Sequence, residues 1–452
     1  AFVTLSAHVS PHVVKTTTGD FLITWYLDGM PFVGREEWEL EHRHKTFNNL
    51  LQTLRAPDYV NVAFWVHDVR RRRRINMPGR FDEAFNQQAS DEYFERLSSR
   101  KVMQNELYFT MVYRPVVEGK RFIEKSTNLE RLRAEQDQAV AKINELATNV
   151  EAVLHDYSPY RLGMYESASG MVFSEVLEFF SYLINRMDEP VPVLSAPIYN
   201  YLPVAKHIFS PKGGDYIIRT PEGRNHYGAI LNIKEYADAT WPGILNGLKY
   251  LDFEYVITHS FTPHSKSEGL RALERTKGMM ISSGDRGVSQ IAELDVAMDQ
   301  LASGNFVLGE YHFTLALYGN SQEELQRQVA MARAELSNAG FVSAKEDLAI
   351  TGSFYAQLPC NWRYRTRLAN VSSLNFLGLS PLHNFATGKR SNNPWGDCVT
   401  VLQTTNGQPY YFNFHATHPG ENSLGEKAIG NTMVIGKSGT GKTALINFLL
   451  SQ

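Results

Sequence analysis

Eight consecutive residues near the carboxyl end of the chain carry the clearest chemistry in the sequence. They read Gly-Lys-Ser-Gly-Thr-Gly-Lys-Thr from Gly436 to Thr443, which matches the phosphate-loop pattern G-x-x-x-x-G-K-[ST]. In this pattern the glycines let backbone N–H groups turn toward phosphate oxygens, and the positive end of the following helix dipole faces the same oxygens. A lysine such as Lys442 reaches the β- and γ-phosphates, while the hydroxyl of a residue such as Thr443 ligates Mg²⁺. The sequence therefore predicts a site for a nucleoside triphosphate with Mg²⁺.

The residues predicted to line this site lie in the loop or in the first turn of the helix after it. They are Gly436, Ser438, Gly439, Thr440, Gly441, Lys442, Thr443 and Ala444. Lys442 and Thr443 are also the predicted catalytic residues, and Thr443 is the predicted metal ligand. The flanking runs fit a strand–loop–helix order, because Thr432–Ile435 is apolar and partly β-branched and Ala444–Leu450 is typical of a helix start.

The same glycines allow two other interpretations. Gly439, Gly441 and Ala444 also satisfy the dinucleotide fingerprint G-x-G-x-x-A. A dinucleotide site has no use for the lysine and hydroxyl at 442 and 443, whereas a triphosphate with Mg²⁺ needs both, so the triphosphate is favoured. The remaining alternative is a glycine-rich turn without a ligand.

Some parts of a complete enzyme are expected outside the sequence. Only nine residues follow Thr443, so the carboxylate that would hold Mg²⁺ and activate water is expected beyond Gln452. We also expect a few residues before Ala1, which is not preceded by an initiator methionine. Alone, the chain is expected to bind nucleotide weakly and to be inactive.

Composition indicates a folded protein of two or three domains. The chain has 452 residues, 43% of them hydrophobic, and a formal net charge of −3 that favours neither nucleic acid nor anionic lipid as a general partner. Its two cysteines, Cys360 and Cys398, have no metal-type spacing and predict free thiols in a reducing compartment, by default the cytoplasm. The most apolar stretch, Met171–Ile184, is interrupted by polar residues, so no membrane span is predicted.

Hydrophobic periodicity predicts a mixed α+β fold with mainly antiparallel sheets. Alternating patterns predict half-buried strands such as Val60–His67 and Leu107–Tyr113, and three- or four-residue steps predict a long helix over Ser126–His155. A proline-rich segment, Pro190–Pro203, suggests an internal boundary, and Asn406-Gly407 predicts a hairpin turn. We expect an N-terminal α+β subdomain over residues 1–190, a second over 191–390, and the start of a nucleotide-binding domain over 391–452.

A run of five arginines, Arg70, Arg71, Arg72, Arg73 and Arg74, is the one strong charge cluster. If the strand continues through it, Arg70, Arg72 and Arg74 point one way and the other two point the opposite way. The run is then either a solvated strand end or a contact for anionic lipid or an acidic partner. Direct nucleic-acid binding is disfavoured, because aromatic residues are not regularly interleaved with the arginines.

Three weaker patterns each have a structural and a functional interpretation. The Ser126–His155 helix has irregular heptads, which favours a core helix over an oligomerisation seam. His415 and His418, with Glu421 nearby, could form a metal site, but Pro419-Gly420 disfavours a shared helical face. The aromatic residues of Tyr410–Phe414 favour packing within a strand over a base-stacking platform.

Beyond the phosphate loop, the sequence resembles the VirB-type (CagE/TrbE/VirB) ATPases of type IV secretion and conjugation along nearly its whole length and in the same order. The segments that carry the resemblance are Val14–Asp20, Leu27–Gly29, Trp65–His67 with Arg70–Arg72, Asn105–Tyr108, Val112–Pro115, Leu358-Pro359, Asn361, Asn375-Phe376, Pro381–His383, Asn393–Gly396 and Pro409–His415. Cys360 departs from the family pattern, in which a glycine is expected between the proline and the asparagine, and this puts a tight backbone turn there in doubt.

The resemblance implies an ATPase at the cytoplasmic face of the bacterial inner membrane that powers pilus assembly and export of DNA–protein or protein substrates. It implies that the 391–452 region begins an α/β RecA-like P-loop domain using ATP and Mg²⁺. Implied partners are further copies in a ring based on a hexamer, small inner-membrane subunits that dock on the N-terminal region, and other secretion ATPases. Two alternatives stay open: an assembly platform that acts irrespective of nucleotide, and a free DNA translocase.

Overall fold

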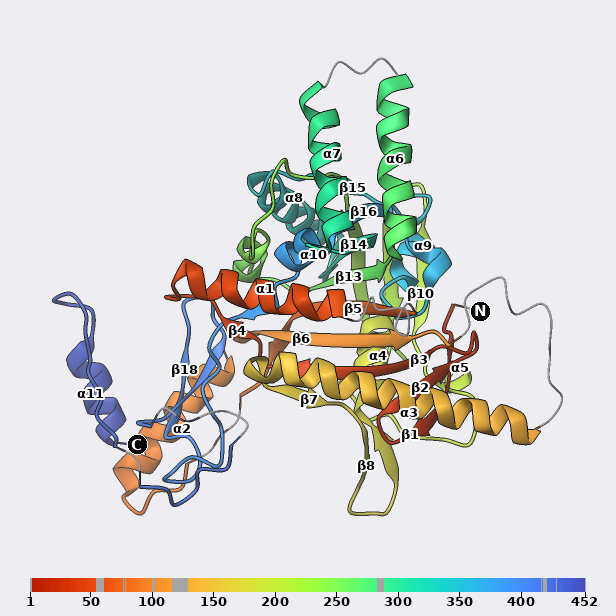
Figure 1. Ribbon diagram of the computed structural model, residues 1–452. Helices are drawn as coiled ribbons and strands as arrows, with labels where there is room; N and C mark the ends of the chain where they lie inside the picture. Colours follow the sequence, from red (N-terminus) through yellow and green to blue (C-terminus); the bar gives the residue numbers. More distant parts are fainter. Residues whose placement is uncertain are drawn as a thin grey trace.

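The structure is a computed structural model that describes residues 2–53, 61–75, 77, 79–99, 102–115, 129–282, 288–415, 417, 421–427 and 429–451. Its main feature is a sheet of thirteen strands, ten of which follow the order β1-β2-β3-β6-β5-β13-β14-β12-β11-β10 (Figure 1). The strands of this path are β1 (Leu5–Ser10), β2 (Val13–Thr16), β3 (Phe21–Leu27), β6 (Val102–Tyr113), β5 (Val62–Arg73), β13 (Tyr255–Pro263), β14 (Leu308–Gly319), β12 (Asn225–Glu235), β11 (Asp215–Arg219) and β10 (Lys206–Ser210). Three short strands pair with strands inside this path: β7 (Pro159–Arg161) with β3, β15 (Val342–Lys345) with β12, and β16 (Ala369–Ser372) with β14.

Smaller pairs and helices complete the described elements. The pairs are β4 (Met30–Pro31) with β17 (His383–Asn384), β8 (Met164–Glu166) with β9 (Val172–Ser174), and β18 (Thr400–Gln403) with β19 (Pro409–Phe412). The α-helices are α1 (Glu37–Thr53), α2 (Ala84–Ser99), α3 (Leu129–Leu154), α4 (Glu175–Asn185), α5 (Ile198–Tyr201), α6 (Lys266–Ser282), α7 (Val288–Ser303), α8 (Gln322–Asn338), α9 (Ile350–Tyr355), α10 (Ser373–Leu379) and α11 (Lys442–Ser451). The 3₁₀ helices are η2 (His155–Tyr157), η3 (Asn246–Tyr250) and η4 (Trp362–Tyr364). No helix in these ranges combines the length and apolar composition needed to pass through a bilayer.

The pairing of β5 with β13 makes the sheet continuous across the segment where the sequence suggested a boundary. The two strands run antiparallel, from Tyr255 opposite Arg70 to Phe261 opposite Phe64. Strands from before residue 190 and strands from after it therefore belong to one sheet. The mainly antiparallel α+β architecture predicted for residues 1–390 is confirmed. The division of this region into subdomains at residue 190 stays a prediction.

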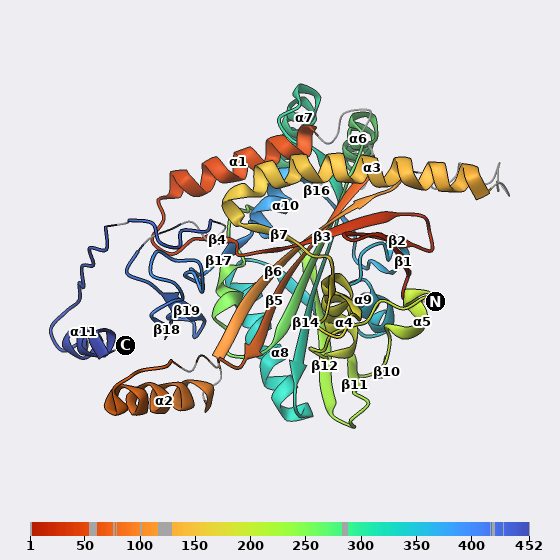
Figure 2. The same cartoon turned by 90° about the horizontal axis from the view of Figure 1, so that it is seen from below.

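Both faces of the sheet are covered, which the alternating pattern did not predict. On β5, Val62, Phe64 and Val66 point to one core, and Ala63 and Trp65 point to the other. Helices α1, α3, α8 and α10 contribute to the first core, while α4, α5 and α9 contribute to the second. Figure 2 shows α1 and α3 side by side along one side of the strands. The strands predicted as half-buried are therefore buried on both faces.

Helix α3 packs as a core helix, in line with its irregular heptads. It occupies Leu129–Leu154, within the predicted Ser126–His155, and its side chains Ile143, Leu146 and Val150 are fully buried in the first core. The remaining residues of the prediction before Leu129 lie outside the described ranges.

The cysteines are thiols, as predicted, and both are buried. Cys360 adopts a left-handed backbone with φ of 69°, a conformation that favours glycine. The tight turn that the family pattern suggested is therefore formed here with a side chain in place. The amide of Asn361 braces it by donating to the carbonyl oxygens of Tyr355 at 2.6 Å and Phe2 at 2.9 Å.

Three histidines lie fully buried on adjacent central strands. They are His67 on β5, His259 on β13 and His312 on β14. Burial lowers the pKa of His67 to about 4 and the pKa of His259 and of His312 to about 3. Each of these side chains is therefore neutral in the folded protein at pH values at which it would be protonated in the unfolded chain.

We expect the free energy of unfolding to fall as the pH is lowered from 7 toward 4. Below about pH 6.5 the unfolded chain takes up protons that the folded chain does not, which costs up to about 1.4 kcal/mol per pH unit for each buried histidine. Urea unfolding at pH 7.5, 6.0 and 5.0 measures the slope. His312→Gln should reduce this slope by removing one of the three groups, and an unfolding free energy that stays constant over this range would contradict the expectation.

Candidate nucleotide site and arginine network

The predicted phosphate loop leads directly into α11, which begins at Lys442. Gly439 and Gly441 have φ of 79° and 85°, values that glycine takes without strain. No atom beyond the chain neighbours lies within 4 Å of the position that a Cβ would occupy at either glycine, so the loop is open to its surroundings there. The helix predicted over Ala444–Leu450 is confirmed as part of α11.

The side chain of Lys442 folds back across the loop. Its Nζ donates to the carbonyl oxygens of Gly436 at 2.6 Å and Lys437 at 2.7 Å. The Thr440 hydroxyl donates to the same Lys437 oxygen at 2.8 Å. The ammonium is thereby held beside the start of α11, where the first backbone N–H groups have no acceptor within the helix. A cation next to unpaired N–H donors suits a polyphosphate, so the residues present fit the predicted ligand.

The structure places the predicted site residues in the loop and in the first turn of α11. Ser438, Gly439 and Thr440 form its turn, and Thr443 and Ala444 lie exposed in the first turn of α11. Their role as nucleotide ligands stays a prediction, on which the proposal below is built.

The prediction of a strand at Thr432–Ile435, just before the loop, is wrong. Residues 431–437 have no strand hydrogen bonding, and the side chains of Met433 and Ile435 are 81% and 84% exposed. A strand forms only beside a hydrogen-bonded neighbour, and no described strand lies alongside this segment. Helix α11 instead contacts α2, where the rings of Phe448 and Tyr93 lie 4.7 Å apart.

The predicted hairpin at Asn406-Gly407 connects the segment before the phosphate loop to the large sheet. Strands β18 and β19 flank the turn that holds Asn406-Gly407, in which the Gly407 N–H donates to the Thr404 carbonyl oxygen at 2.9 Å and Gly407 has a positive φ of 83°. Arg70 Nη2 donates to the Asn406 carbonyl oxygen at 3.0 Å, and Arg70 Nη1 donates to Asn105 Oδ1 at 2.9 Å. The Gln408 side chain is fully buried beside them. The tip of the hairpin is thus fixed to β5 and β6.

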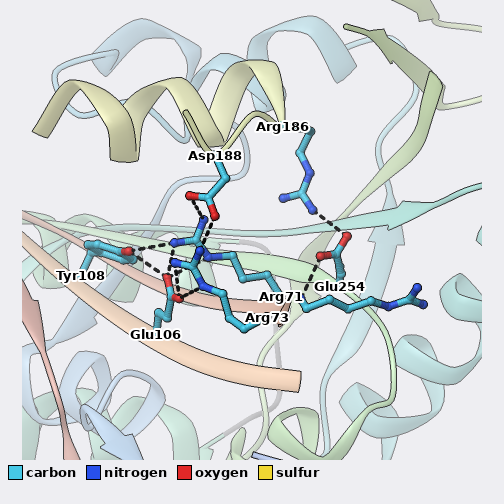
Figure 3. A network of polar contacts seen from close by, with 8 residues as sticks. Arg71, Arg73, Glu106, Tyr108, Arg186, Asp188 and Glu254 are labelled. Atoms are coloured by element: carbon cyan, nitrogen blue, oxygen red, sulfur yellow. Dashed lines mark hydrogen bonds and ion pairs between the residues drawn. The ribbon is translucent and has the colours of Figure 1, made fainter. Parts of the chain in front are cut away.

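Figure 3 shows that two further arginines of the run are paired inside the protein. Arg71 Nη2 lies 2.6 Å from Glu106 Oε2, and Arg73 Nη2 lies 2.8 Å from Glu106 Oε1. Both arginines also pair with Asp188, which follows α4, and the Tyr108 hydroxyl donates to Glu106 at 2.8 Å. These contacts join β5, β6 and the segment after α4.

Glu106 is fully buried at the centre of this arginine network, defined here as Arg71, Arg73, Glu106, Tyr108 and Asp188. Burial alone would raise the pKa of Glu106, but the guanidinium groups of Arg71 and Arg73 outweigh it and hold the pKa below its usual range. Burial likewise raises the pKa of Tyr108 well above its usual value, and the charge of Glu106 adds to the shift. Tyr108 therefore stays a neutral donor to a charged carboxylate.

A neighbouring ion pair extends the link between α4 and the sheet. Arg186, which ends α4, is buried and its Nη2 lies 3.1 Å from Glu254 Oε2 (Figure 3). The other oxygen of Glu254 accepts from the backbone N–H of Arg72 at 3.0 Å.

Both interpretations of the arginine run are therefore wrong for Arg70 and Arg71, which are buried. Arg73 is half-buried and paired with Glu106 and Asp188, while Arg72 and Arg74 are exposed. The alternation was predicted correctly for Arg71 and Arg73, which share a face. The available signal was Glu106, the one charged residue of β6, whose role becomes clear only once β5 is paired with β6.

Among the residues that the structure describes, the remaining candidates add no site. His415 is buried against the ring of Trp395, His418 lies outside the described residues, and within the described ranges no three His, Cys, Asp or Glu side chains are grouped to hold a metal. The rings of Phe412 and Phe414 pack edge to face at 5.1 Å, which supports packing as the role of the aromatic residues of Tyr410–Phe414.

We expect Glu106→Gln to destabilise the protein by about 3–5 kcal/mol, because it leaves buried guanidinium charge without its carboxylate. The matched control is Glu92→Gln, which removes a carboxylate paired with Arg96 on the surface of α2 and should change stability by less than about 0.5 kcal/mol. Urea unfolding of both variants at pH 7.5 measures the difference. Equal effects of the two substitutions would refute a structural role for the network.

Comparisons with known proteins show which family the chain belongs to. Residues 12–120 match the N-terminal domain of the type IV secretion system ATPase VirB4/TrbE, and residues 160–367 match the CagE, TrbE, VirB family, component of type IV transporter system. Type IV secretion system protein virB4 of Brucella suis is 38% identical over 100% of this chain, and PtlC of Bordetella pertussis is 36% identical over the same share. The virB4 protein of Bartonella henselae is 33% identical over 98% of the chain.

In each of these comparisons the chain spans 55% of the relative, that is, about half the length of the curated relatives it matches. The two matched regions cover β2 to β6 and β7 to η4, which includes both sides of the β5–β13 pairing. The resemblance inferred from scattered segments is confirmed, and the chain belongs to the CagE, TrbE, VirB family of type IV secretion components.

Proposed function

We propose that the protein is an ATPase that energises type IV secretion, with its nucleotide site at Gly436–Ala444. The observation that carries the proposal is the loop itself: two glycines with positive φ, a lysine ammonium drawn across the loop, and a helix that starts at that lysine. The relatives are named as type IV secretion proteins, and one of the matched families is described as an ATPase. Together these favour a motor over a ligand-free turn.

The residues of the loop would divide the work of holding ATP and Mg²⁺. When bound, ATP supplies a γ-phosphoryl group for transfer to water. Lys442 would neutralise charge on the phosphates, for which its Nζ would exchange its bonds to the Gly436 and Lys437 carbonyl oxygens for phosphate oxygens. The Thr443 hydroxyl, exposed in the first turn of α11, would hold the metal ion. The backbone N–H groups from Gly439 to Ala444 would orient the phosphates.

The segment around the loop has the surface expected of a domain that packs further. Ile429, Met433, Ile435, Ile446 and Leu450 are all exposed apolar side chains. A RecA-like domain would bury such residues in a parallel sheet and its helices. We therefore propose that residues 391–452 begin a motor domain of this type, and that the α+β regions over 1–190 and 191–390 form the docking part.

The proposed setting is the cytoplasmic face of the bacterial inner membrane, with the protein bound peripherally. Its partners there would be further copies in a ring, small inner-membrane subunits of the apparatus, and other secretion ATPases. The work would be pilus biogenesis and export of DNA–protein or protein substrates. Of the arginine run, only Arg72 and Arg74 remain exposed for an anionic surface.

A second candidate function is an assembly platform that works irrespective of nucleotide. The observation in its favour is that the thirteen-stranded sheet and its two cores are built entirely from residues before the loop. Such a body could bind inner-membrane subunits whether or not ATP is present. A free DNA translocase, the remaining alternative, would show turnover that DNA stimulates without any secretion partner.

Lys442→Ala should lower ATP turnover at least about 100-fold in the longest form of the protein that its gene encodes, because it removes the cation that faces the phosphates. The matched control is Lys437→Ala, a lysine of the same loop at a position where the pattern accepts any residue, and it should retain turnover within about threefold. Phosphate release at saturating ATP and Mg²⁺ is the measurement. Unchanged turnover in Lys442→Ala would refute the motor proposal.

Capture of inner-membrane subunits by Lys442→Ala separates the motor from the platform. A platform should capture the same subunits with and without ATP in both wild type and variant, because its binding surface lies on the sheet body. Capture that requires ATP, or that Lys442→Ala abolishes, would exclude an independent platform. Thermal unfolding of the variant at the wild-type temperature confirms that any loss is not a folding defect.

A further inference from the structure

Two antiparallel helices, α6 and α7, project from the body as a helical hairpin. Figure 1 shows them standing clear of the other helices at the top of the view, with only their lower ends against the sheet. A small core at the base holds them, formed by Leu273 of α6, Leu301 of α7, and Phe306 and Leu308 next to β14. With 17 and 16 residues, the helices are about 25 Å long. Above this base, α6 and α7 lie mainly against each other among the described elements.

The two helices carry opposite charge. Helix α6 has four basic residues, Lys266, Arg271, Arg275 and Lys277, against two acidic ones, Glu268 and Glu274. Helix α7 has three acidic residues, Glu293, Asp295 and Asp299, and no lysine or arginine. The hairpin therefore presents a basic helix beside an acidic one.

Little of this charge is neutralised within the hairpin. Lys277 Nζ lies 2.5 Å from Asp295 Oδ1 and ties the two helices together. Arg271, Arg275, Glu293 and Asp299 are exposed, and none of them forms an ion pair with another described residue. Two cations of α6 and two anions of α7 are thus left for an external partner.

The spacing of these residues places them on outward faces at matching levels. Arg271, Arg275 and Met279 follow at four-residue steps and share one exposed face of α6. The Lys277–Asp295 pair sets the alignment of the antiparallel helices, so Arg271 lies near the level of Asp299 and Arg275 near the level of Asp295.

Exposed apolar side chains accompany the charges on both helices. Met279 on α6 is 57% exposed and Val296 on α7 is 56% exposed. Val296 lies between Glu293 and Asp299 in the sequence of the acidic helix. An apolar residue within each charged face gives a docked pair something to bury as well as charges to match.

We propose that the hairpin is a contact between copies of this chain, in which the basic face of α6 on one copy docks against the acidic face of α7 on the next. Two hairpins that stand side by side and point the same way place Arg271 of one copy opposite Asp299 of its neighbour. The same arrangement places Arg275 near Glu293 and Asp295. Because each copy offers one basic and one acidic side, the contact repeats from copy to copy and suits closure into a ring.

This inference deepens the proposed function, since it rests on the proposed self-assembly and names the surface that would carry it. The proposed partner is a second copy of this chain, because a contact that repeats from copy to copy requires both signs of charge on each hairpin. A different protein partner would need only one sign of charge.

Charge reversal on each helix tests the contact. In the first variant, Arg271→Glu with Arg275→Glu makes both helices acidic; in the second, Glu293→Lys with Asp299→Lys makes both helices net basic. The Lys277–Asp295 pair is kept in both. Each variant alone should self-associate at least about tenfold more weakly than wild type, measured by sedimentation velocity across a concentration series. An equimolar mixture of the two should recover association to within about threefold of wild type.

Recovery in the mixture is the decisive result, because damage to folding in either variant would not be repaired by mixing. The matched control is Arg271→Lys with Arg275→Lys, which keeps the charge and should associate like wild type. Self-association that neither reversal weakens would overturn the hairpin contact while leaving a ring through another surface intact. Failure of the mixture to recover would also overturn it, and a wild-type chain that stays monomeric would overturn the hairpin contact and the proposed ring together. None of these outcomes depends on ATP turnover, so the motor proposal is judged separately.

Discussion

The antiparallel pairing of β5 with β13 is the interaction on which the rest of the structure depends. It joins strands from the first part of the chain to strands from the second along seven residue pairs, from Arg70–Tyr255 to Phe64–Phe261. Without this seam the two halves would each expose a long unpaired edge made of buried residues. With it, both faces of a single sheet can be covered, and the helices of each face pack across the seam and not only within one half.

The same strand carries the charges that organise its surroundings. Three of its last four residues make these contacts. Arg70 donates a hydrogen bond to the hairpin that leads to the phosphate loop, and Arg71 and Arg73 form ion pairs with Glu106 and Asp188. Burying such groups is costly unless each is paired and hydrogen-bonded, and here the carboxylates and carbonyl oxygens come from separate elements. The pairing therefore makes the ends of β5 and β6, the segment after α4 and the β18–β19 hairpin depend on one another.

Local features were predictable from the sequence because local patterns determine them. The strand predicted at Leu107–Tyr113 lies within β6, and the helix predicted over Ala444–Leu450 lies within α11. The phosphate loop was evident because glycine, lysine and threonine are each required by chemistry at fixed spacing. Strand order was not predictable, since pairing between β5 and β13 involves residues far apart in the chain. The burial of Arg70 and Arg71 followed from that order, and so escaped prediction. The prediction of a strand at Thr432–Ile435 was wrong for the opposite reason: its composition suits a strand, but no strand in the part of the chain that the structure describes lies beside it to pair with it.

The tight turn at Cys360 bears on how the molecule can be labelled. Burial raises the pKa of the Cys360 thiol well above its usual range and that of Cys398 to about 11, so almost no reactive thiolate exists at neutral pH. These are the two cysteines of the sequence. In the folded chain these two thiols therefore react slowly with maleimides. A single cysteine introduced on an exposed helix would carry a fluorophore or spin label without prior removal of Cys360 and Cys398.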